Sequence, residues 1–255
     1  MKTYALLGEK LGHSHSPLIH NEIFKAFNID ANYIKLECKK EELEDIINSL
    51  RKGIYHGFNV TIPYKREVMK YLDEIDPSAK KIGAVNTIAY KDGKIIGYNT
   101  DYFGFKNELL YFNVECKNKN AYVLGTGGAS LAVYKALIDL GCNTKYVSRE
   151  PKDINTISYK DLENENIDII VNATPVGMYP NIDASPISES IAKKAKYVLD
   201  IIFNPKQTKL LKYANSNMNG LYMLVGQAIK AEEIWQDMVY NKSIEDLVKK
   251  VEEMI

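Results

Sequence analysis

A glycine-rich segment near the middle of the chain constrains the fold more than any other feature. Gly125-Thr-Gly-Gly-Ala-Ser130 follows a run of apolar residues at 121–124 and precedes a helical pattern at 130–140. Such a turn between a strand and a helix brings backbone N–H groups and a helix N-terminus up to a pyrophosphate. We therefore predict a dinucleotide site in a Rossmann-like domain. The alternative is a tight strand–helix turn that needs flexible residues.

Strand-like and helical patterns alternate on both sides of this loop. Beyond it, predicted strands at residues 145–147, 168–171 and 197–201 indicate parallel βαβ units wound right-handedly. The first half is predicted to contain strands at 3–7, 33–36 and 57–60, helices at 17–27 and 41–50, and a hairpin at 89–98 centred on Asp92-Gly93. Two amphipathic helices are predicted at 225–240 and 244–253. The pattern predicts an α/β protein of two domains, the first with a mixed sheet and the second Rossmann-like.

Composition and charge limit the partners. The 255 residues include 33 basic and 33 acidic side chains, so no net field attracts nucleic acid or an anionic membrane. No stretch approaches the ~20 apolar residues of a membrane span, and the N-terminal apolar run is too short for a secretion signal. Cys38, Cys116 and Cys142 are spaced neither as metal ligands nor as a disulfide framework, which indicates reduced thiols. We expect a soluble cytoplasmic protein, monomeric or homodimeric, that acts on a small molecule.

The second predicted strand of the nucleotide domain ends in Val147-Ser148-Arg149. About 20 residues beyond the glycine loop, an NAD site carries an acid for the ribose 2′-hydroxyl, whereas an NADP site has an arginine for the 2′-phosphate. Arg149 is one of only three arginines in the chain and therefore favours NADP. Glu150 beside it could repel a phosphate or point to solvent, so NAD remains an alternative.

Two motifs in the first half indicate a polar small-molecule pocket. Asn59-Val-Thr-Ile-Pro-Tyr-Lys65 and Asn99-Thr-Asp101 place a lysine and an aspartate among small hydrogen-bonding residues at the ends of predicted strands. Each residue alone has a simpler interpretation. Lys65 could be a solvated lysine at the start of a helix, and Asp101 could be the N-cap of a helix beginning near Tyr102. Their joint occurrence beside a nucleotide-binding domain favours the pocket.

The segment His13-Ser14-His15-Ser16-Pro17 runs into a predicted helix. Ser14 and Ser16, two residues apart in a turn, could present both hydroxyls to one carboxylate near a helix N-terminus. Ser16 could instead be the N-cap before Pro17. His13 and His15 lack a carboxylate or cysteine at a supporting spacing, so we predict no metal site.

Seven segments in order across nearly the whole chain resemble the shikimate dehydrogenase family. They are Ser14-x-Ser16, Asn59-Val-Thr-Ile-Pro-Tyr-Lys65, Gly83-Ala-Val-Asn-Thr87, Asn99-Thr-Asp101, Gly125-Thr-Gly-Gly-Ala129, Asn172-Ala-Thr-Pro-Val-Gly-Met178 and Met223-Leu-Val-Gly-Gln-Ala228. The lysine and Asn-Thr-Asp segments are specific, whereas many enzymes share the glycine loop. The resemblance implies reversible, NADP-dependent reduction of 3-dehydroshikimate to shikimate on the route to aromatic amino acids.

The resemblance also implies a division of labour along the chain. The substrate and catalytic domain would be residues 1–101 plus 225–255, the C-terminal helices folding back onto it, and residues 102–224 would bind NADP, with a cleft between the two lobes. The implied catalytic pair is Lys65 and Asp101. Substrate contacts would come from this pair and from Ser14, Ser16, Asn59, Thr61, Asn86 and Gln227. Cofactor contacts would come from Gly125, Thr126, Gly127, Gly128, Ala129, Ser148, Arg149, Thr174, Ile201, Gly220 and Met223.

Two positions depart from the family pattern. Phe203 stands where members usually carry a tyrosine that helps to hold the substrate carboxylate, and Ser148-Arg-Glu150 replaces the usual Asn-Arg-Thr. An NAD-dependent quinate or quinate/shikimate dehydrogenase is therefore one alternative. A nucleotide-responsive regulatory module without turnover is another, because a fold does not imply catalysis.

The chemistry of the pair predicts which member moves the proton. An isolated lysine has a pKa of ~10.4, so action as a base near neutral pH requires a shift of ~3 units. A nearby aspartate opposes that shift by favouring the ammonium form, although burial and a helix N-terminus act the other way. In the direction of reduction we expect Lys65 to be a charged proton donor and Asp101 to orient it.

Overall fold

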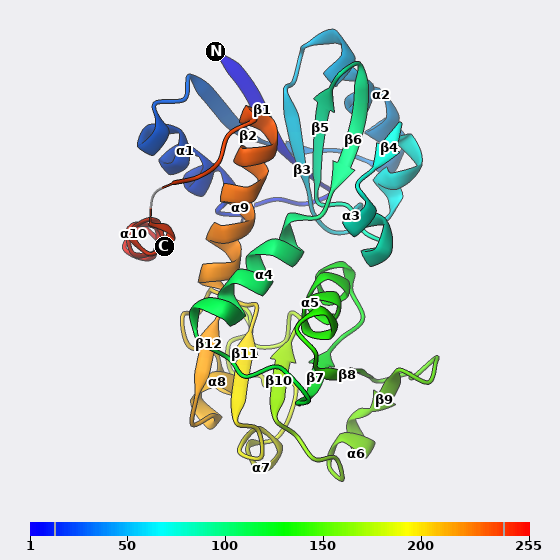
Figure 1. Ribbon diagram of the computed structural model, residues 1–255, viewed down its shortest axis with the longest axis vertical. Coiled ribbons are helices and arrows are strands. Elements are labelled where there is room, and N and C mark those ends of the chain that lie inside the picture. The colour runs from blue at the N-terminus through cyan, green and yellow to red at the C-terminus, as the bar shows by residue number, and fades with distance from the viewer. Residues whose placement is uncertain (13, 242) are drawn as a thin grey trace. The chain divides into compact units, whose positions relative to one another are not determined.

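The computed structural model describes residues 1–12, 14–241 and 243–255, which form two compact units. Unit 1 comprises Met1–Gly104 and Val225–Ile255, and unit 2 comprises Phe105–Leu224. Each unit is built around its own six-stranded sheet with helices packed on it (Figure 1). The predicted fold class, a mixed-sheet α/β part and a Rossmann-like part, is confirmed.

The sheet of unit 1 has the strand order β2-β1-β3-β5-β6-β4. Its strands are β1 (Lys2–Gly8), β2 (Ala31–Glu37), β3 (Gly57–Val60), β4 (Glu74–Ile75), β5 (Thr87–Lys91) and β6 (Lys94–Tyr98). Strand β1 pairs in parallel with β2 and β3, whereas β5 runs antiparallel to both β3 and β6. The β5–β6 turn is the predicted one, with Asp92 and Gly93 at φ angles of 49° and 77°.

This mixed topology brings several chain segments to one edge of the sheet. Strands β1 and β3 both end there, because they are parallel neighbours. Strand β5 begins at the same edge, since Thr87 pairs with Asn59, and β6 ends there, since Tyr98 pairs with Thr87. We call this edge of unit 1, where residues 8–12, 14–16, 61–65, 83–86 and 99–101 meet, the polar edge.

Helices cover both faces of this sheet. They are α1 (Ser16–Phe27), α2 (Leu43–Asn48), α3 (Pro77–Ile82), α9 (Leu221–Gln236), α10 (Ile244–Glu252) and the 3-10 turns η1 (Lys40–Glu42), η2 (Ser49–Lys52) and η3 (Glu67–Tyr71). The helix predicted at 41–50 is α-helical only over α2, with the 3-10 turns η1 and η2 directly before and after it. The helix predicted at 225–240 begins four residues earlier and ends at Gln236.

The C-terminal part of α9 is fastened to the sheet by one tryptophan. Trp235 donates from its indole nitrogen to the carbonyl of Ile88 at 3.0 Å and stacks on Tyr4 with ring centroids 4.7 Å apart. A Cβ on Gly57 would lie 2.3 Å from that indole nitrogen, so only glycine fits beneath the ring. On the opposite face, Phe58, Val60 and Ile88 join the main core of unit 1.

The sheet of unit 2 is entirely parallel, in the order β12-β11-β10-β7-β8-β9. Its strands are β7 (Asn120–Leu124), β8 (Asn143–Ser148), β9 (Thr156–Ser158), β10 (Ile169–Asn172), β11 (Tyr197–Asp200) and β12 (Asn217–Asn219). The helices are α5 (Gly128–Asp139), α6 (Tyr159–Leu162), α7 (Glu189–Ala192) and α8 (Lys209–Tyr213), and α4 (Thr100–Tyr111) enters the unit from unit 1. The strand order reverses between β7 and β10, the place where doubly wound sheets bind ligands.

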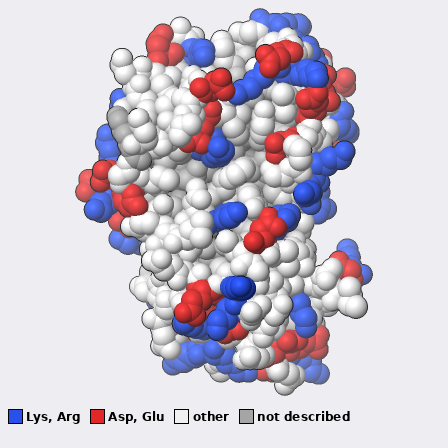
Figure 2. Space-filling model, viewed as in Figure 1, with Lys and Arg blue, Asp and Glu red and all other residues white. Residues whose placement is uncertain are grey.

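Surface charge and helix length were compared with what a membrane or a charged partner would require. On the face shown in Figure 2, acidic and basic side chains lie interspersed on each unit. Among the helices of the described residues, none is both long and apolar enough to cross a membrane.

Candidate active site

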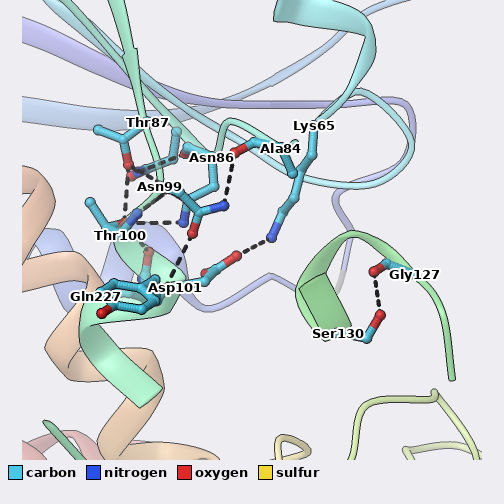
Figure 3. A network of polar contacts seen from close by, with 12 residues as sticks. Lys65, Ala84, Asn86, Thr87, Asn99, Thr100, Asp101, Gly127, Ser130 and Gln227 are labelled. Atoms are coloured by element: carbon cyan, nitrogen blue, oxygen red, sulfur yellow. Dashed lines mark hydrogen bonds and ion pairs between the residues drawn. The ribbon is translucent and has the colours of Figure 1, made fainter. Parts of the chain in front are cut away.

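The lysine and aspartate singled out in the sequence form an ion pair at the polar edge. Lys65 Nζ lies 2.5 Å from Asp101 Oδ2, with 13% and 10% of the two side chains exposed (Figure 3). The lysine backbone is held by Val85, whose N–H donates to the Lys65 carbonyl at 2.8 Å. The expected helix start at Lys65 is wrong, because the residue lies in a turn and the following 3-10 helix begins at Glu67.

Asp101 is available for this pair because another residue caps its helix. The Asn99 side chain accepts a hydrogen bond from the backbone of Tyr102 at 3.2 Å, and Asp101 is the second residue of α4. The interpretation of Asp101 as the N-cap is therefore wrong. Asn99 Nδ2 also donates to the carbonyl of Ala84 at 2.9 Å, which ties the helix start to the segment before β5.

Asn86 and Thr100 fix the first turn of α4 against the start of β5. The Asn86 side-chain oxygen accepts from the Thr100 backbone at 2.7 Å, and its Nδ2 donates to the Thr100 hydroxyl at 3.0 Å. Gln227 on α9 joins this cluster, with its Oε1 3.4 Å from the same hydroxyl (Figure 3). The structure thus brings together Asn86, Gln227, Asp101 and Lys65, four of the residues predicted to bind substrate.

Asn59 lies beside this cluster, and its amide has protein partners on both sides. Its oxygen accepts from the Tyr33 hydroxyl at 2.7 Å, and its Nδ2 donates to the Asn86 carbonyl at 3.3 Å and the Thr87 hydroxyl at 3.0 Å. Asn59 is only 5% exposed. The sequence marked Asn59 but not Tyr33 or Thr87. In the sequence, Tyr33 is an ordinary aromatic residue of a strand, and Thr87 is only the last residue of the Gly83 to Thr87 segment.

The two serines before α1 lie close together, as the spacing predicted. Ser14 Oγ donates to Ser16 Oγ at 3.1 Å and accepts from the Ser16 backbone at 3.3 Å. The alternative of Ser16 as N-cap is wrong, because His15 occupies the N-cap position and α1 begins at Ser16. Both serines are partly exposed. His13, considered above as a weak metal ligand, lies outside the described residues.

Thr61 is the remaining predicted substrate residue of unit 1. It follows β3 directly, and its backbone N–H donates to the carbonyl of Leu7 at 2.9 Å, which places it beside the end of β1. The loop that carries Ser14 and Ser16 starts from that same strand. The Thr61 hydroxyl forms no hydrogen bond with any described residue, and the side chain is partly exposed.

The glycine loop of unit 2 has the geometry that a pyrophosphate needs. Gly125 ends β7 with a φ of 98°, a value that favours glycine, and a Cβ there would lie 2.8 Å from Thr174. Gly127 is the N-cap of α5, has no side-chain cap, and has open space where a Cβ would be. Thr126 and Gly127 are exposed, Gly128 and Ala129 open α5, and its first N–H groups are therefore free to bind an anion. Ser130, the buried residue in the third small position, donates to the Gly127 carbonyl at 2.6 Å and steadies the turn.

The predicted cofactor-selecting residues follow the neighbouring strand. The backbone N–H of Gly125 donates to the Val147 carbonyl at 2.9 Å, so Ser148 and Arg149 lie at the edge of the sheet where the glycine loop begins. Ser148 Oγ accepts from the Glu150 backbone at 3.2 Å and shapes this turn. Arg149 is exposed and, within the described residues, forms no ion pair, so its guanidinium is available to a phosphate.

A buried acid, not marked in the sequence, joins the two loops that carry Thr174 and Ile201. Asp200 Oδ1 accepts from Asn172 Nδ2 at 3.0 Å and from the Ile202 backbone at 3.1 Å. Asn172 in turn accepts from the hydroxyl of Thr174 at 2.7 Å. Burial raises the pKa of Asp200 to about 6, although the hydrogen bonds it accepts lower it.

The other predicted cofactor residues come near the end of unit 2. The position of Gly220 requires glycine, because a Cβ there would lie 2.1 Å from the Ile201 carbonyl oxygen. Met223 follows on α9 and is buried. Phe203, the departure from the family pattern, is partly buried in the turn after β11. No three His, Cys, Asp or Glu side chains of the described residues gather as they would around a metal ion.

Comparison with known proteins gives one consistent answer. A family model described as the shikimate dehydrogenase substrate binding domain matches residues 6–88. A shikimate dehydrogenase (NADP(+)) from Clostridium perfringens is 46% identical, over 96% of each chain. A chorismate mutase/shikimate 5-dehydrogenase fusion protein from Clostridium acetobutylicum matches with a TM-score of 0.96 at 43% identity, covering 100% of this chain and 98% of that one. A shikimate 5-dehydrogenase from Thermus thermophilus, solved with NADP(H) and shikimate, matches with a TM-score of 0.87 at 28% identity over 98% and 99% of the chains.

Proposed function

Because the chain belongs to the shikimate dehydrogenase family, an NADP-dependent group of enzymes of the shikimate pathway, we propose that it reversibly reduces 3-dehydroshikimate to shikimate. In this reaction Lys65 is the proton donor and Asp101 is its partner. Unit 1 would hold the substrate and unit 2 the cofactor. The observation that carries this assignment is the ion pair of Lys65 and Asp101 at the polar edge.

The geometry of the pair supports an electrostatic role for the lysine. Its Nζ lies 2.5 Å from a carboxylate oxygen, and the small exposed fraction of both side chains strengthens their attraction relative to a surface pair. An ammonium group can donate a proton to the oxygen that gains negative charge during reduction, and it stabilises that charge before the proton moves. Asp101 holds the ammonium in place and has a second carboxylate oxygen with which to accept a hydrogen bond from a substrate hydroxyl.

The remaining polar groups at this edge suit a polyhydroxylated carboxylic acid. The hydroxyls of Ser14 and Ser16 are 3.1 Å apart, close enough to donate to the two oxygens of one carboxylate. Thr61, Asn86 and Gln227 would bind the ring hydroxyls. Asn59 has its amide engaged by the protein, and we therefore assign it mainly to holding Asn86 and Thr87 in place.

Residues of unit 2 fit NADP. The N–H groups of the loop from Gly125 to Ala129 would bind the pyrophosphate, Arg149 would bind the 2′-phosphate, and Ser148, Thr174, Ile201, Gly220 and Met223 would line the rest of the site. When bound, the cofactor supplies or accepts the hydride. The work left to the chain is to hold the substrate carbonyl, to stabilise charge on its oxygen and to move the proton, all of which fall to unit 1.

Replacing the lysine tests the proton-donor role. We expect Lys65→Met to lower kcat for shikimate oxidation by ~10²–10⁴-fold, because its main interaction strengthens in the transition state. Lys94→Met is the matched control, since Lys94 also pairs with a carboxylate of unit 1, Glu74, but on the exposed start of β6. A higher KM with an unchanged kcat would show that Lys65 binds the substrate and does not donate the proton.

Replacing the acid tests the pair. Asp101→Asn keeps the shape of the side chain but removes the charge that orients Lys65. We expect a large loss of kcat/KM for shikimate. An unchanged kcat/KM would contradict the idea that the two residues act together.

A comparison of two substrates with two cofactors decides between the remaining alternatives. Higher kcat/KM with shikimate and NADP supports the proposal, and higher kcat/KM with quinate and NAD favours the quinate enzyme, which Phe203 and Glu150 leave open. Tight binding of both ligands without turnover would favour a regulatory module. Phe203→Tyr adds the hydroxyl that most family members carry, and a lower KM for shikimate would locate this position at the substrate carboxylate.

A further inference from the structure

A chain of buried side chains extends from the polar edge into the interior of unit 1. Tyr33 on β2 is 3% exposed, and its hydroxyl donates to the side-chain oxygen of Asn59 at 2.7 Å. On its other side, the amide of Asn59 donates to the Thr87 hydroxyl at 3.0 Å and to the Asn86 carbonyl. Thr87 and Asn86 both contact Thr100, the residue before Asp101 (Figure 3).

The ring of Tyr33 is itself held from behind. It stacks on the imidazole of His20, with centroids 4.0 Å apart and an interplanar angle of 4°. His20 Nδ1 lies 2.6 Å from Glu232 Oε1, and the two side chains are 0% and 1% exposed. This separation is that of a hydrogen bond between the two side chains. His20 Nε2 is buried without a hydrogen-bond partner among the described residues, so Glu232 and the stack with Tyr33 hold the ring.

The hydrogen bonds of Asn59 with Tyr33, Asn86 and Thr87 allow only one of the two orientations of the Asn59 amide. A flipped amide would turn its NH₂ group towards the tyrosine hydroxyl and its oxygen towards the carbonyl of Asn86, where two acceptors would meet. Burial raises the pKa of Tyr33 well above its ordinary value, so the hydroxyl keeps its proton and remains a donor. The Asn59 oxygen is thereby satisfied, and both amide hydrogens are directed to Asn86 and Thr87.

We propose that Tyr33 is a positioning residue for the reducing centre, by which we mean the pair of Lys65 and Asp101. Held by the His20–Glu232 pair, its hydroxyl fixes the amide of Asn59 and, through Thr87 and Asn86, the first turn of the helix that carries Asp101. This inference rests on the assignment of Lys65 and Asp101 as the catalytic pair. Tyr33 itself touches neither of them, so its influence on the reaction is indirect.

Tyr33→Phe tests the proposal. The Asn59 oxygen loses its donor in a buried site, and we expect kcat/KM for shikimate to fall about tenfold or more. The KM for NADP should not change, because the chain of contacts lies wholly in unit 1. Tyr4→Phe is the control. Tyr4 belongs to the same aromatic cluster and its hydroxyl accepts a hydrogen bond from Gln236 at 3.0 Å, so this variant should lose thermal stability but keep its kcat/KM.

Each outcome decides the matter. A selective loss in Tyr33→Phe supports the proposal, whereas a kcat/KM equal to that of wild type or of Tyr4→Phe overturns it. If Tyr33→Phe does not fold, Thr87→Val and Thr87→Ser replace it. A loss in Thr87→Val that Thr87→Ser restores supports the chain of contacts, and an unchanged kcat/KM in Thr87→Val overturns it. A wild-type protein that is inactive with shikimate and NADP would instead refute the proposed function.

Discussion

The buried carboxyl of Asp200 predicts a measurable dependence of stability on pH. It is 1% exposed and accepts hydrogen bonds from Asn172, Ile202 and Thr208, the last at 2.7 Å. Asp200→Asn removes the charge and keeps most of these bonds. The asparagine oxygen still accepts from Ile202 and Asn172, and its NH₂ group can donate to the Thr208 hydroxyl.

The sign and size follow from the raised pKa. The folded protein holds this proton more tightly than the unfolded chain, with a pKa of about 6 against 3.8. The stabilisation from protonated Asp200 is therefore complete below the unfolded pKa and is lost as pH rises through the folded pKa. The difference, 6 − 3.8 = 2.2 units, corresponds to about 3 kcal/mol. About 2 kcal/mol of this loss falls between about pH 4.5 and about pH 7.5.

Urea unfolding of both proteins across this pH range measures the effect. The difference in unfolding free energy between Asp200→Asn and wild type isolates the one carboxyl, because all other titrating groups are shared. We expect the variant to gain about 2 kcal/mol relative to wild type as pH rises. Thr208→Val is a second check. It removes a hydrogen bond that lowers the pKa of Asp200 and should move the transition to higher pH. Parallel stability curves for wild type and Asp200→Asn would refute the reasoning.

Two further predictions concern the cofactor and the core. Arg149→Gln should raise the KM for NADP by about tenfold or more while leaving the KM for NAD unchanged, because a charge-assisted bond to the 2′-phosphate is lost; equal effects on both cofactors in steady-state kinetics would contradict this role. Gly57→Ala should destabilise the protein by about 1–3 kcal/mol in urea unfolding, because the new methyl group displaces Trp235. Gly12→Ala, where a Cβ meets nothing within 4 Å, is its control.

The sequence predicted those elements that carry a strong local signal. Apolar runs marked β1, β3, β7 and β10, and Asp-Gly marked the hairpin turn. The short edge strands were missed, because two or three residues such as Glu74–Ile75 show no periodicity. The 3-10 turns on both sides of α2, in the segment predicted as one helix at 41–50, were also missed, because hydrophobic spacing does not distinguish a 3-10 turn from an α-helical one.

The residues of the site also differ in how far the sequence could predict them. Lys65 and Asp101 could be paired from their motifs, and the structure places them 2.5 Å apart. The motifs could not predict which groups the asparagine side-chain amides bind. Asparagine at a strand end can bind a ligand or a neighbouring threonine, and only the packing shows that Asn59 is already engaged by Tyr33 and Thr87. Asp200 was missed for a similar reason, since a single acid at the end of an apolar strand has no distinctive spacing.

The hairpin of β5 and β6 also has a practical consequence for protein engineering. Both strands meet the polar edge at one end and the exposed Asp92-Gly93 turn at the other. Five residues of strand at ~3.4 Å each separate the turn from the reducing centre by ~17 Å. A peptide tag or a fluorescent label inserted between Asp92 and Gly93 would leave the ladder intact. The turn is therefore a permissive attachment point from which to immobilise the enzyme.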